Sequence, residues 1–158
     1  MPKFYPLKVK DLYKDTEQCS VIEFDMPEDL KDKFKYKAGQ YLTLRETING
    51  EDIRRSYSLC SSPIDNEWKV AVKQIPDGKF STHVNKFLKK DDTLQVMKPM
   101  GRFGTTISEI PKNYIVFTAG SGITPILSMI KTHLAKEPNS TFKLFYLNRT
   151  VKSIIFKE

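Results

Sequence analysis

The sequence has few of the residues on which metal centres and disulfide frameworks depend. Its 158 residues include two cysteines, Cys19 and Cys60, and two histidines, His83 and His133. Two cysteines cannot supply the four thiolates of an iron–sulfur or structural zinc site, or a framework of several disulfides. We predict no metal site, a buried unreactive thiol at Cys60, and both histidines on helix surfaces.

Long hydrophobic runs are also missing. No apolar stretch approaches the ~20 residues needed to cross a bilayer, and the N-terminal residues 1–5 lack the apolar core of a secretory signal. We therefore expect a cytoplasmic protein with no membrane insertion. Hydrophobic residues make up 39% of the chain, which is enough for a core in one domain or two small ones.

The charge balance is basic, with a formal net charge of +7 and a pI near 9.3. Such a chain favours polyanionic partners, for example nucleic acid, a phosphorylated cofactor or an acidic protein. The lysines, however, alternate with acidic residues over residues 31–37 and 89–92, a pattern typical of solvated faces. A basic barrel that binds single-stranded nucleic acid through lysines and Phe34, Tyr36 and Tyr41 remains the alternative function.

Short β-strands separated by turns are predicted from about Tyr5 to Met97. The sequence alternates with a period of two at Leu7 and Val9, Val21 and Glu23, Leu42 and Leu44, and Trp68, Val70 and Val72. Such strands form a sandwich or a small barrel, and we predict an antiparallel Greek-key β-barrel. A helix interrupts it, because Val84, Phe87 and Leu88 have helical spacing behind two possible N-caps, Ser81 and Thr82.

The pattern changes after Met97, where prolines and glycines mark a connector. A buried-type strand at 114–118, a glycine turn, a helix with an apolar stripe at Ile126, Ile130 and Leu134, and a strand at 142–147 follow. This order predicts the first βαβ portion of a parallel-sheet, nucleotide-binding domain. We place the boundary near residues 105–112, which gives domains at 1–107 and 108–158.

Two segments of the predicted barrel suit a nucleotide cofactor. Strand alternation places Arg55 and Tyr57 on one face and Ser56 and Ser58 on the other. A guanidinium pairs with phosphate, a phenol offers a flat face, and a serine hydroxyl or amide can meet a heteroaromatic nitrogen. Residues 78–82 open the helix, where backbone amides and the helix dipole attract phosphate. An edge strand with a surface arginine and a plain capped turn are the alternatives.

A third segment, residues 120–125, is similar to the dinucleotide-binding fingerprint, with Pro125 in place of its third glycine. Gly120 and Gly122 allow a tight turn whose amides approach an anion, and Thr124 offers a hydroxyl. Arg149 ends the next strand, where such folds read the adenosine ribose. It could pair with a 2′-phosphate, which favours NADPH, or be a solvated arginine. A glycine turn without a ligand is again the alternative.

Motifs over nearly the whole chain resemble the ferredoxin-NADP reductase superfamily. In order they read KAGQYLTL, RSYSLCSSP, GKFS, PMGRFG, AGSGITPIL and YLNRT. The resemblance is greatest to reductase components of multicomponent oxygenases, of the phenylacetate-CoA oxygenase reductase type. It implies an FAD-binding barrel followed by an α/β domain for NADH or NADPH. It also implies an FAD-dependent oxidoreductase that passes electrons from NAD(P)H through FAD to an iron–sulfur protein or an oxygenase component.

The resemblance assigns roles to the matching residues. Arg55 would hold the FAD phosphates, Tyr57 would pack on the isoalloxazine, and Ser58 would hydrogen-bond near the reactive flavin nitrogen, with Ser56 beside them. The expected pyrophosphate loop consists of Gly78, Lys79, Phe80, Ser81 and Thr82, with Val72 and Lys73 as backbone neighbours. The expected nicotinamide nucleotide loop consists of Gly120, Gly122 and Thr124. Ser58 and Thr124, the latter nearest to where hydride passes, are the catalytic candidates.

The chain departs from the family toward its C-terminus. The family's nucleotide domain continues to a Cys-Gly-Pro motif beside the nicotinamide, and the oxygenase reductases add a ferredoxin domain with four cysteines. The present sequence ends at Glu158. We expect a piece of a longer protein that retains the FAD site, while reduction by NAD(P)H is incomplete in this chain alone.

Overall fold

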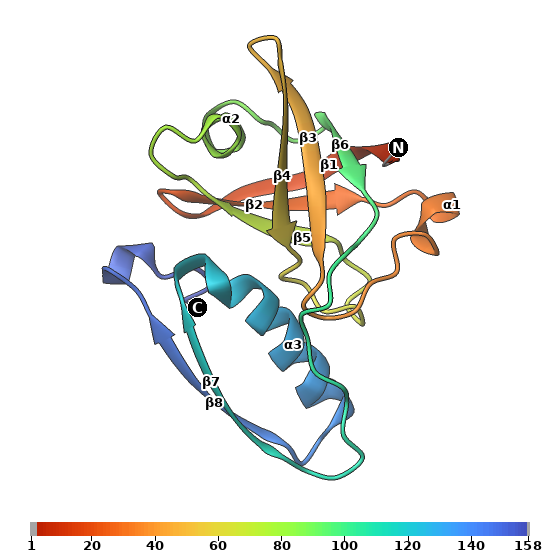
Figure 1. Ribbon diagram of the computed structural model, residues 1–158, viewed down its shortest axis with the longest axis vertical. Coiled ribbons are helices and arrows are strands. Elements are labelled where there is room, and N and C mark those ends of the chain that lie inside the picture. Colours follow the sequence, from red (N-terminus) through yellow and green to blue (C-terminus); the bar gives the residue numbers. More distant parts are fainter. Residues whose placement is uncertain (1–2, 158) are drawn as a thin grey trace.

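An antiparallel barrel and a smaller α/β unit that packs beneath it make up the fold (Figure 1). The computed structural model describes residues 3–157. The barrel contains β1 (Phe4–Thr16), β2 (Cys19–Asp25), α1 (Glu28–Lys31), β3 (Tyr41–Ile48), β4 (Glu51–Ser58), β5 (Lys69–Lys73), α2 (Lys79–Lys86) and β6 (Thr93–Met97). The second unit contains β7 (Asn113–Ala119), η1 (Gly120–Gly122), α3 (Ile123–Lys136), β8 (Thr141–Leu147) and η2 (Val151–Ser153).

The six barrel strands form one sheet in the order β4-β3-β6-β1-β2-β5, with antiparallel neighbours. The two end strands meet through an isolated bridge between Leu59 and Val70. Beyond that bridge β4 and β5 diverge, and α2 contacts both of them. The predicted antiparallel barrel is confirmed, and its opening between β4 and β5 is where the candidate site lies.

The alternating apolar residues fill the barrel as the period-two pattern predicts. The fully buried side chains include Leu7, Val9, Leu42, Leu44, Val70, Val72, Leu94 and Val96. Two residues of the nucleic-acid hypothesis, Phe34 and Tyr36, also belong to this core, and Tyr36 donates its hydroxyl hydrogen bond to Glu67 O at 3.0 Å. Their rings cannot stack on bases, so that alternative is wrong for two of its three aromatic residues.

Strand β2 is buried on both faces, whereas the alternation of Val21 and Glu23 predicts a half-buried strand. The outer face is covered because Val21 packs with Ile123 of α3 and Ile155 near the C-terminus. Glu23 is 8% exposed and pairs with Lys10 and with Lys69. The local pattern fails here because a later part of the chain folds over this strand.

Helix α2 differs from the predicted helix at both ends. It begins at Lys79 after Gly78, so Ser81 and Thr82 lie inside its first turns and are not N-caps. Ser81 Oγ donates back to Gly78 O at 3.2 Å. At the other end, Val84 is buried as predicted, but Phe87 is 62% exposed because the helical geometry ends before it.

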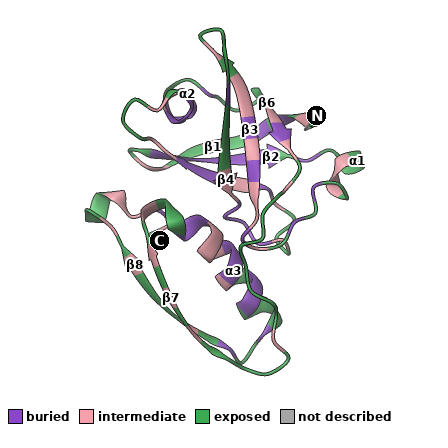
Figure 2. Cartoon of the chain, viewed as in Figure 1, coloured by how far each residue is buried: buried purple, intermediate pink, exposed green. Residues whose placement is uncertain are grey.

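Strands β7 and β8 pair in parallel over their whole length, as predicted. Helix α3 contacts both strands. The other face carries Ile115 and Phe117, which are 64% and 71% exposed, and much of both strands has the colour of exposed residues in Figure 2. The prediction of a strand buried on both faces is therefore wrong for this face, because within residues 3–157 helices cover one side of the pair.

The buried side of α3 is largely polar, which the sequence pattern does not predict. Ile126 is half-buried and Leu134 is 46% exposed, whereas Ser128, Thr132 and His133 are buried. His133 is not a helix-surface residue, since it contacts Glu137 and Thr105 through its two ring nitrogens. Cys60 is buried as predicted, and burial raises the pKa of its thiol to about 12.

Thr105 belongs to the connector between β6 and β7, which contains the expected domain boundary near residues 105–112. A hydrogen bond between Thr105 and His133 joins this connector to α3. No helix among residues 3–157 is long and apolar enough to cross a membrane.

Candidate functional site

A cavity of about 770 Å³ occupies the opening between β4, β5 and the start of α2. It brings together two segments that the sequence singles out, one from a strand and one from a helix. The predicted residues that line it are Arg55, Ser56, Tyr57, Lys73, Gly78, Lys79, Phe80 and Ser81.

The edge of β4 supplies backbone hydrogen-bonding groups to this opening. Just past β4, Leu59 N donates to Gln40 O, just before β3, while Cys60 N donates to Lys69 O of β5. Because such bonds alternate along an antiparallel strand, the amides of Ser58 and Ser56 face away from β3, toward the opening. Ser58 does not itself line the cavity, and the Ser56 hydroxyl lies 2.9 Å from that of Thr43.

Arg55 is the cation of β4 that remains available to a ligand. Arg54 and Lys79 are held by carboxylates, Asp52 at 2.6 Å and Glu51 at 2.7 Å. Among the ion pairs of residues 3–157 none includes Arg55, whose Nη1 donates to Arg54 O at 2.7 Å. A guanidinium has five N–H donors, so most of those on Arg55 can meet phosphate oxygens.

Tyr57 gives the cavity a flat wall. Its ring centroid lies 5.9 Å from that of Phe80 on α2, with the two planes inclined by 34°. Burial raises the pKa of Tyr57 to about 12, although the nearby Arg55 charge acts in the opposite direction. The phenol therefore stays neutral at physiological pH and can pack against an aromatic ring system.

The loop before α2 is closed by Ser81 and needs a glycine. Ser81 Oγ donates to Gly78 O and accepts from Ile75 N, both at 3.2 Å. A Cβ on residue 78 would collide with the side chains of Ile75 and Ser81. No side chain caps the N-terminus of α2, so its first amides are available to an anion in the cavity.

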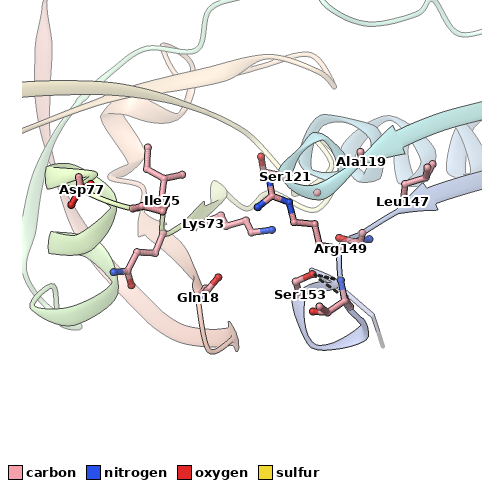
Figure 3. Close-up of a pocket in the computed structure, with 14 residues that line it drawn as sticks. Gln18, Lys73, Ile75, Asp77, Ala119, Ser121, Leu147, Arg149 and Ser153 are labelled. Atoms are coloured by element: carbon pink, nitrogen blue, oxygen red, sulfur yellow. Dashed lines mark hydrogen bonds between the residues drawn. The ribbon is translucent and has the colours of Figure 1, made fainter.

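A second cavity of about 1050 Å³ adjoins the first and lies between the barrel and the α/β unit (Figure 3). Two predicted residues line it, Gly120 at the glycine turn and Arg149 after β8. Both cavities are lined by Lys73, Ile75, Pro76, Asp77 and Ser121. Lys73 Nζ lies 3.9 Å from the point where a Cβ on Gly120 would stand, so this side chain reaches from β5 to the glycine turn.

Four further predicted residues line neither cavity. Val72 belongs to the barrel core, and Thr82 Oγ1 accepts from Gln74 Nε2 at 3.5 Å. A Cβ on Gly122 would stand 2.8 Å from Thr118 Oγ1, so this glycine serves close packing. Thr124 is buried, and its hydroxyl donates to Ser121 O at 3.0 Å. The binding roles of these residues stay predictions, and the structure gives each of them a packing or bonding role within the chain.

The sequence analysis did not predict that the side chain of Lys73 lines both cavities. It named Lys73 only as a backbone neighbour of the pyrophosphate loop. Alternation contains the signal, because the side chain that follows buried Val72 in a strand points to the opposite face. Gln18, in the turn between β1 and β2, also lines the second cavity. No local pattern marks it, since only the tertiary fold brings that turn to the site.

Comparison with known families decides the identity of the barrel. The pattern of the oxidoreductase FAD-binding domain matches residues 6–104, which is more than half of the chain. The chain belongs to this family. The FAD-binding domain thus coincides with the barrel that holds the first cavity, and the predicted relationship to the ferredoxin reductase superfamily is confirmed.

Individual relatives support the same family assignment. One component of the 1,2-phenylacetyl-CoA epoxidase of Escherichia coli is 40% identical over 100% of this chain and 45% of its own length. The ferredoxin reductase component of a Rhodococcus rhodochrous 3-ketosteroid-9-alpha-monooxygenase is 38% identical over 96% of this chain and 43% of its own.

Among solved structures, phthalate dioxygenase reductase, described as transferring electrons from pyridine nucleotides to [2Fe-2S], superposes with a TM-score of 0.77. It is 27% identical, and the match covers 97% of this chain and 46% of that one. The chain therefore spans less than half the length of these relatives.

The first cavity fits FAD, the cofactor that this family binds. Its unpaired Arg55 and the uncapped start of α2 offer donors for a diphosphate, while Tyr57 offers a face for a ring system. The collision that a Cβ on Gly78 would make explains why the loop beside these donors has a glycine there.

Proposed function

We propose that this chain is the flavin-holding part of an NAD(P)H-dependent oxidoreductase that passes electrons to an iron–sulfur protein or an oxygenase component. Its relatives support this proposal, since they include a component of an epoxidase, the ferredoxin reductase component of a monooxygenase and a reductase that connects pyridine nucleotides with [2Fe-2S]. In this proposal residues 1–107 form the FAD domain, and residues 108–158 begin the nucleotide domain.

The observation that carries the proposal is the shared wall of the two cavities. A reductase of this kind must hold two nucleotides close together, and the five residues common to both cavities lie between the two sites. When bound, FAD supplies two-electron chemistry with a nicotinamide and one-electron chemistry with an iron–sulfur acceptor. The contribution of the protein is to bind, orient and tune the two nucleotides.

In the first cavity, Arg55 and the amides of residues 79–81 would bind the FAD diphosphate. The Tyr57 ring would pack against the flavin, and the outward-facing amides of Ser56 and Ser58 would donate to its polar edge. These assignments use groups that lack a protein partner or lie at the strand edge. Lys73 has its ammonium near both sites and would balance the negative charge between them.

In the second cavity, Gly120 would bring its turn close to the nicotinamide nucleotide, and Gly122 and Thr124 would keep the shape of that turn. Arg149 and Lys73 are the two cations of the cavity lining, against one carboxylate, that of Asp77. This balance supports recognition of a 2′-phosphate, so we propose NADPH as the favoured nucleotide. Arg149→Gln should reduce the preference for NADP⁺ over NAD⁺ in equilibrium binding.

The decisive test is a titration of the purified chain with FAD, followed by visible absorption and flavin fluorescence. We expect one FAD per chain, with a shifted spectrum and quenched emission as the flavin packs against Tyr57. A chain that stays colourless after addition of FAD and desalting would contradict the proposal.

A further inference from the structure

One buried side chain, that of Asn85, connects α2 to three barrel strands. Asn85 is 9% exposed, and its amide has no unused hydrogen-bonding position. Nδ2 donates to Val72 O of β5 and to Ser81 O within α2, both at 2.9 Å. Oδ1 accepts from Ser20 Oγ of β2 at 2.9 Å and from Lys14 Nζ of β1 at 2.8 Å. Three groups of the barrel, Val72 O, Ser20 Oγ and Lys14 Nζ, therefore fix the rotation and depth of α2.

These bonds continue to the wall of the first cavity. Ser81, whose carbonyl is held by Asn85, uses its hydroxyl to bond both Ile75 N and Gly78 O. A continuous path thus leads from the Lys14 ammonium through Asn85 and Ser81 to the loop that precedes α2. Asn85 and Lys14 line neither cavity.

We propose that Asn85, supported by Lys14, is a positioning residue that sets the first turn of α2 for the FAD diphosphate. The inference rests on the proposed use of the first cavity and adds residues that none of the cofactor motifs contains. A bond from an ammonium strengthens the amide's own hydrogen bonds, because such networks polarise in a low-dielectric interior. Without Asn85 the carbonyls of Val72 and Ser81 would lose a buried donor, and the start of α2 could shift.

The test compares two flavins, one with a diphosphate and one without phosphate. FAD and riboflavin are titrated into the wild-type chain, Asn85→Leu and Lys14→Met, with flavin fluorescence as the readout. A loss of about 1.4 kcal/mol in binding free energy corresponds to a tenfold change in Kd. We expect the Kd for FAD to rise about tenfold in Asn85→Leu and about threefold in Lys14→Met, and the Kd for riboflavin to stay constant.

A general loss of packing would instead weaken both flavins equally, and that result would overturn the proposal, as would an unchanged Kd for FAD. Ser140→Ala is the matched control, because it removes a buried hydroxyl that bonds Glu137 in the α/β unit, away from α2. It should leave both flavins unaffected. If Asn85→Leu does not fold, Lys14→Met decides, since only the ammonium contact with Asn85 is removed.

Hydrogen exchange of the unliganded chain separates this proposal from the proposed function. Amides of residues 75–82 should exchange faster in Lys14→Met than in the wild type, while those of β7 and β8 should not change. Unchanged exchange at 75–82 would overturn the positioning role whether or not FAD binds. A wild-type chain that binds no FAD, with faster exchange in the variant, would overturn only the function.

Discussion

Replacing Arg55 by alanine tests the cofactor site most directly. Arg55 lines the first cavity, and one of its N–H groups is used by Arg54 O. Its other donors have no carboxylate partner among residues 3–157, so the guanidinium can pair with phosphate without first breaking an ion pair. The variant removes this pairing and leaves the Tyr57 wall and the start of α2 unchanged.

The expected loss is set by the exposure of the site. A hydrogen bond to a charged group contributes about 1.5–3 kcal/mol, and the lower end applies because Arg55 is exposed to solvent. A loss of about 1.5 kcal/mol raises the Kd for FAD roughly tenfold. Arg55→Lys keeps the charge but not the planar fork, so its Kd should lie between those of the wild type and Arg55→Ala.

The assay is fluorescence titration at two salt concentrations. Arg45→Ala is the control, because Arg45 lies on β3 with its guanidinium 4.3 Å from the Phe4 ring centroid and does not line the cavity. We expect Arg45→Ala to keep the wild-type Kd, and Arg55→Ala to show a weaker salt dependence than the wild type. Equal effects of the two substitutions, or an unchanged Kd in Arg55→Ala, would refute the reasoning.

Three further predictions concern the loop, the C-terminal contact and pH. Gly78→Ala should weaken FAD binding more than it lowers stability, since the added Cβ displaces the loop, and a wild-type Kd would contradict this. Ile155→Ala should lower the free energy of unfolding in urea by about 2–4 kcal/mol, because Ile155 is fully buried, whereas a loss below about 1 kcal/mol would show that the segment is not docked. Desolvation raises the pKa of Glu137, but hydrogen bonds from the Ser108 amide and three side chains outweigh it and lower the pKa from 4.5 to about 2. The stability from this carboxylate is therefore present above pH 4.5 and lost as the pH falls toward 2. Urea midpoints measured across this range should fall less in Glu137→Gln than in the wild type.

The barrel could be predicted from sequence because the alternation of apolar and polar residues in its strands shows which side chains are buried. Leu42 and Leu44 face the core, and the polar residues between and beside them do not, so a period of two identifies the fold. Val21 and Glu23 misled the same reasoning, since the cover over β2 comes from Ile155, more than a hundred residues later. The periodicity of a short segment cannot predict a contact with a residue so distant in the sequence.

Helix α3 shows the same limit in another form. Its apolar stripe predicts a buried face at Leu134, but Leu134 is exposed and the buried face includes hydroxyl groups that bond the barrel. Ser128 Oγ donates to Ser61 O at 2.6 Å, and the hydroxyls of Ser62 and Thr132 lie 2.8 Å apart. Hydroxyl side chains buried by paired hydrogen bonds cannot be told from solvated ones in a sequence, because the partner determines which state is favourable.

In the candidate site, too, local features could be predicted from sequence and features that depend on distant contacts could not. Most residues of the motifs at 55–58 and 78–82 line the first cavity. Their place there could be predicted because a strand edge and a helix start create their geometry locally. The relative position of the two cavities could not be predicted from sequence, because it depends on contacts made by residues outside every motif.

Ile155 is inserted between β2, β5 and α3, and the adjacent Phe156 N donates to Asp15 Oδ2 at 3.0 Å. The Tyr146 hydroxyl joins this segment to the glycine turn, accepting from Ile155 N at 3.3 Å and donating to Gly120 O at 2.9 Å. The position of the second cavity relative to the first is thus fixed by residues that line neither cavity. Substitutions at Tyr146 or Ile155 should therefore change how the two sites meet, and leave the FAD contacts of Arg55 as they are.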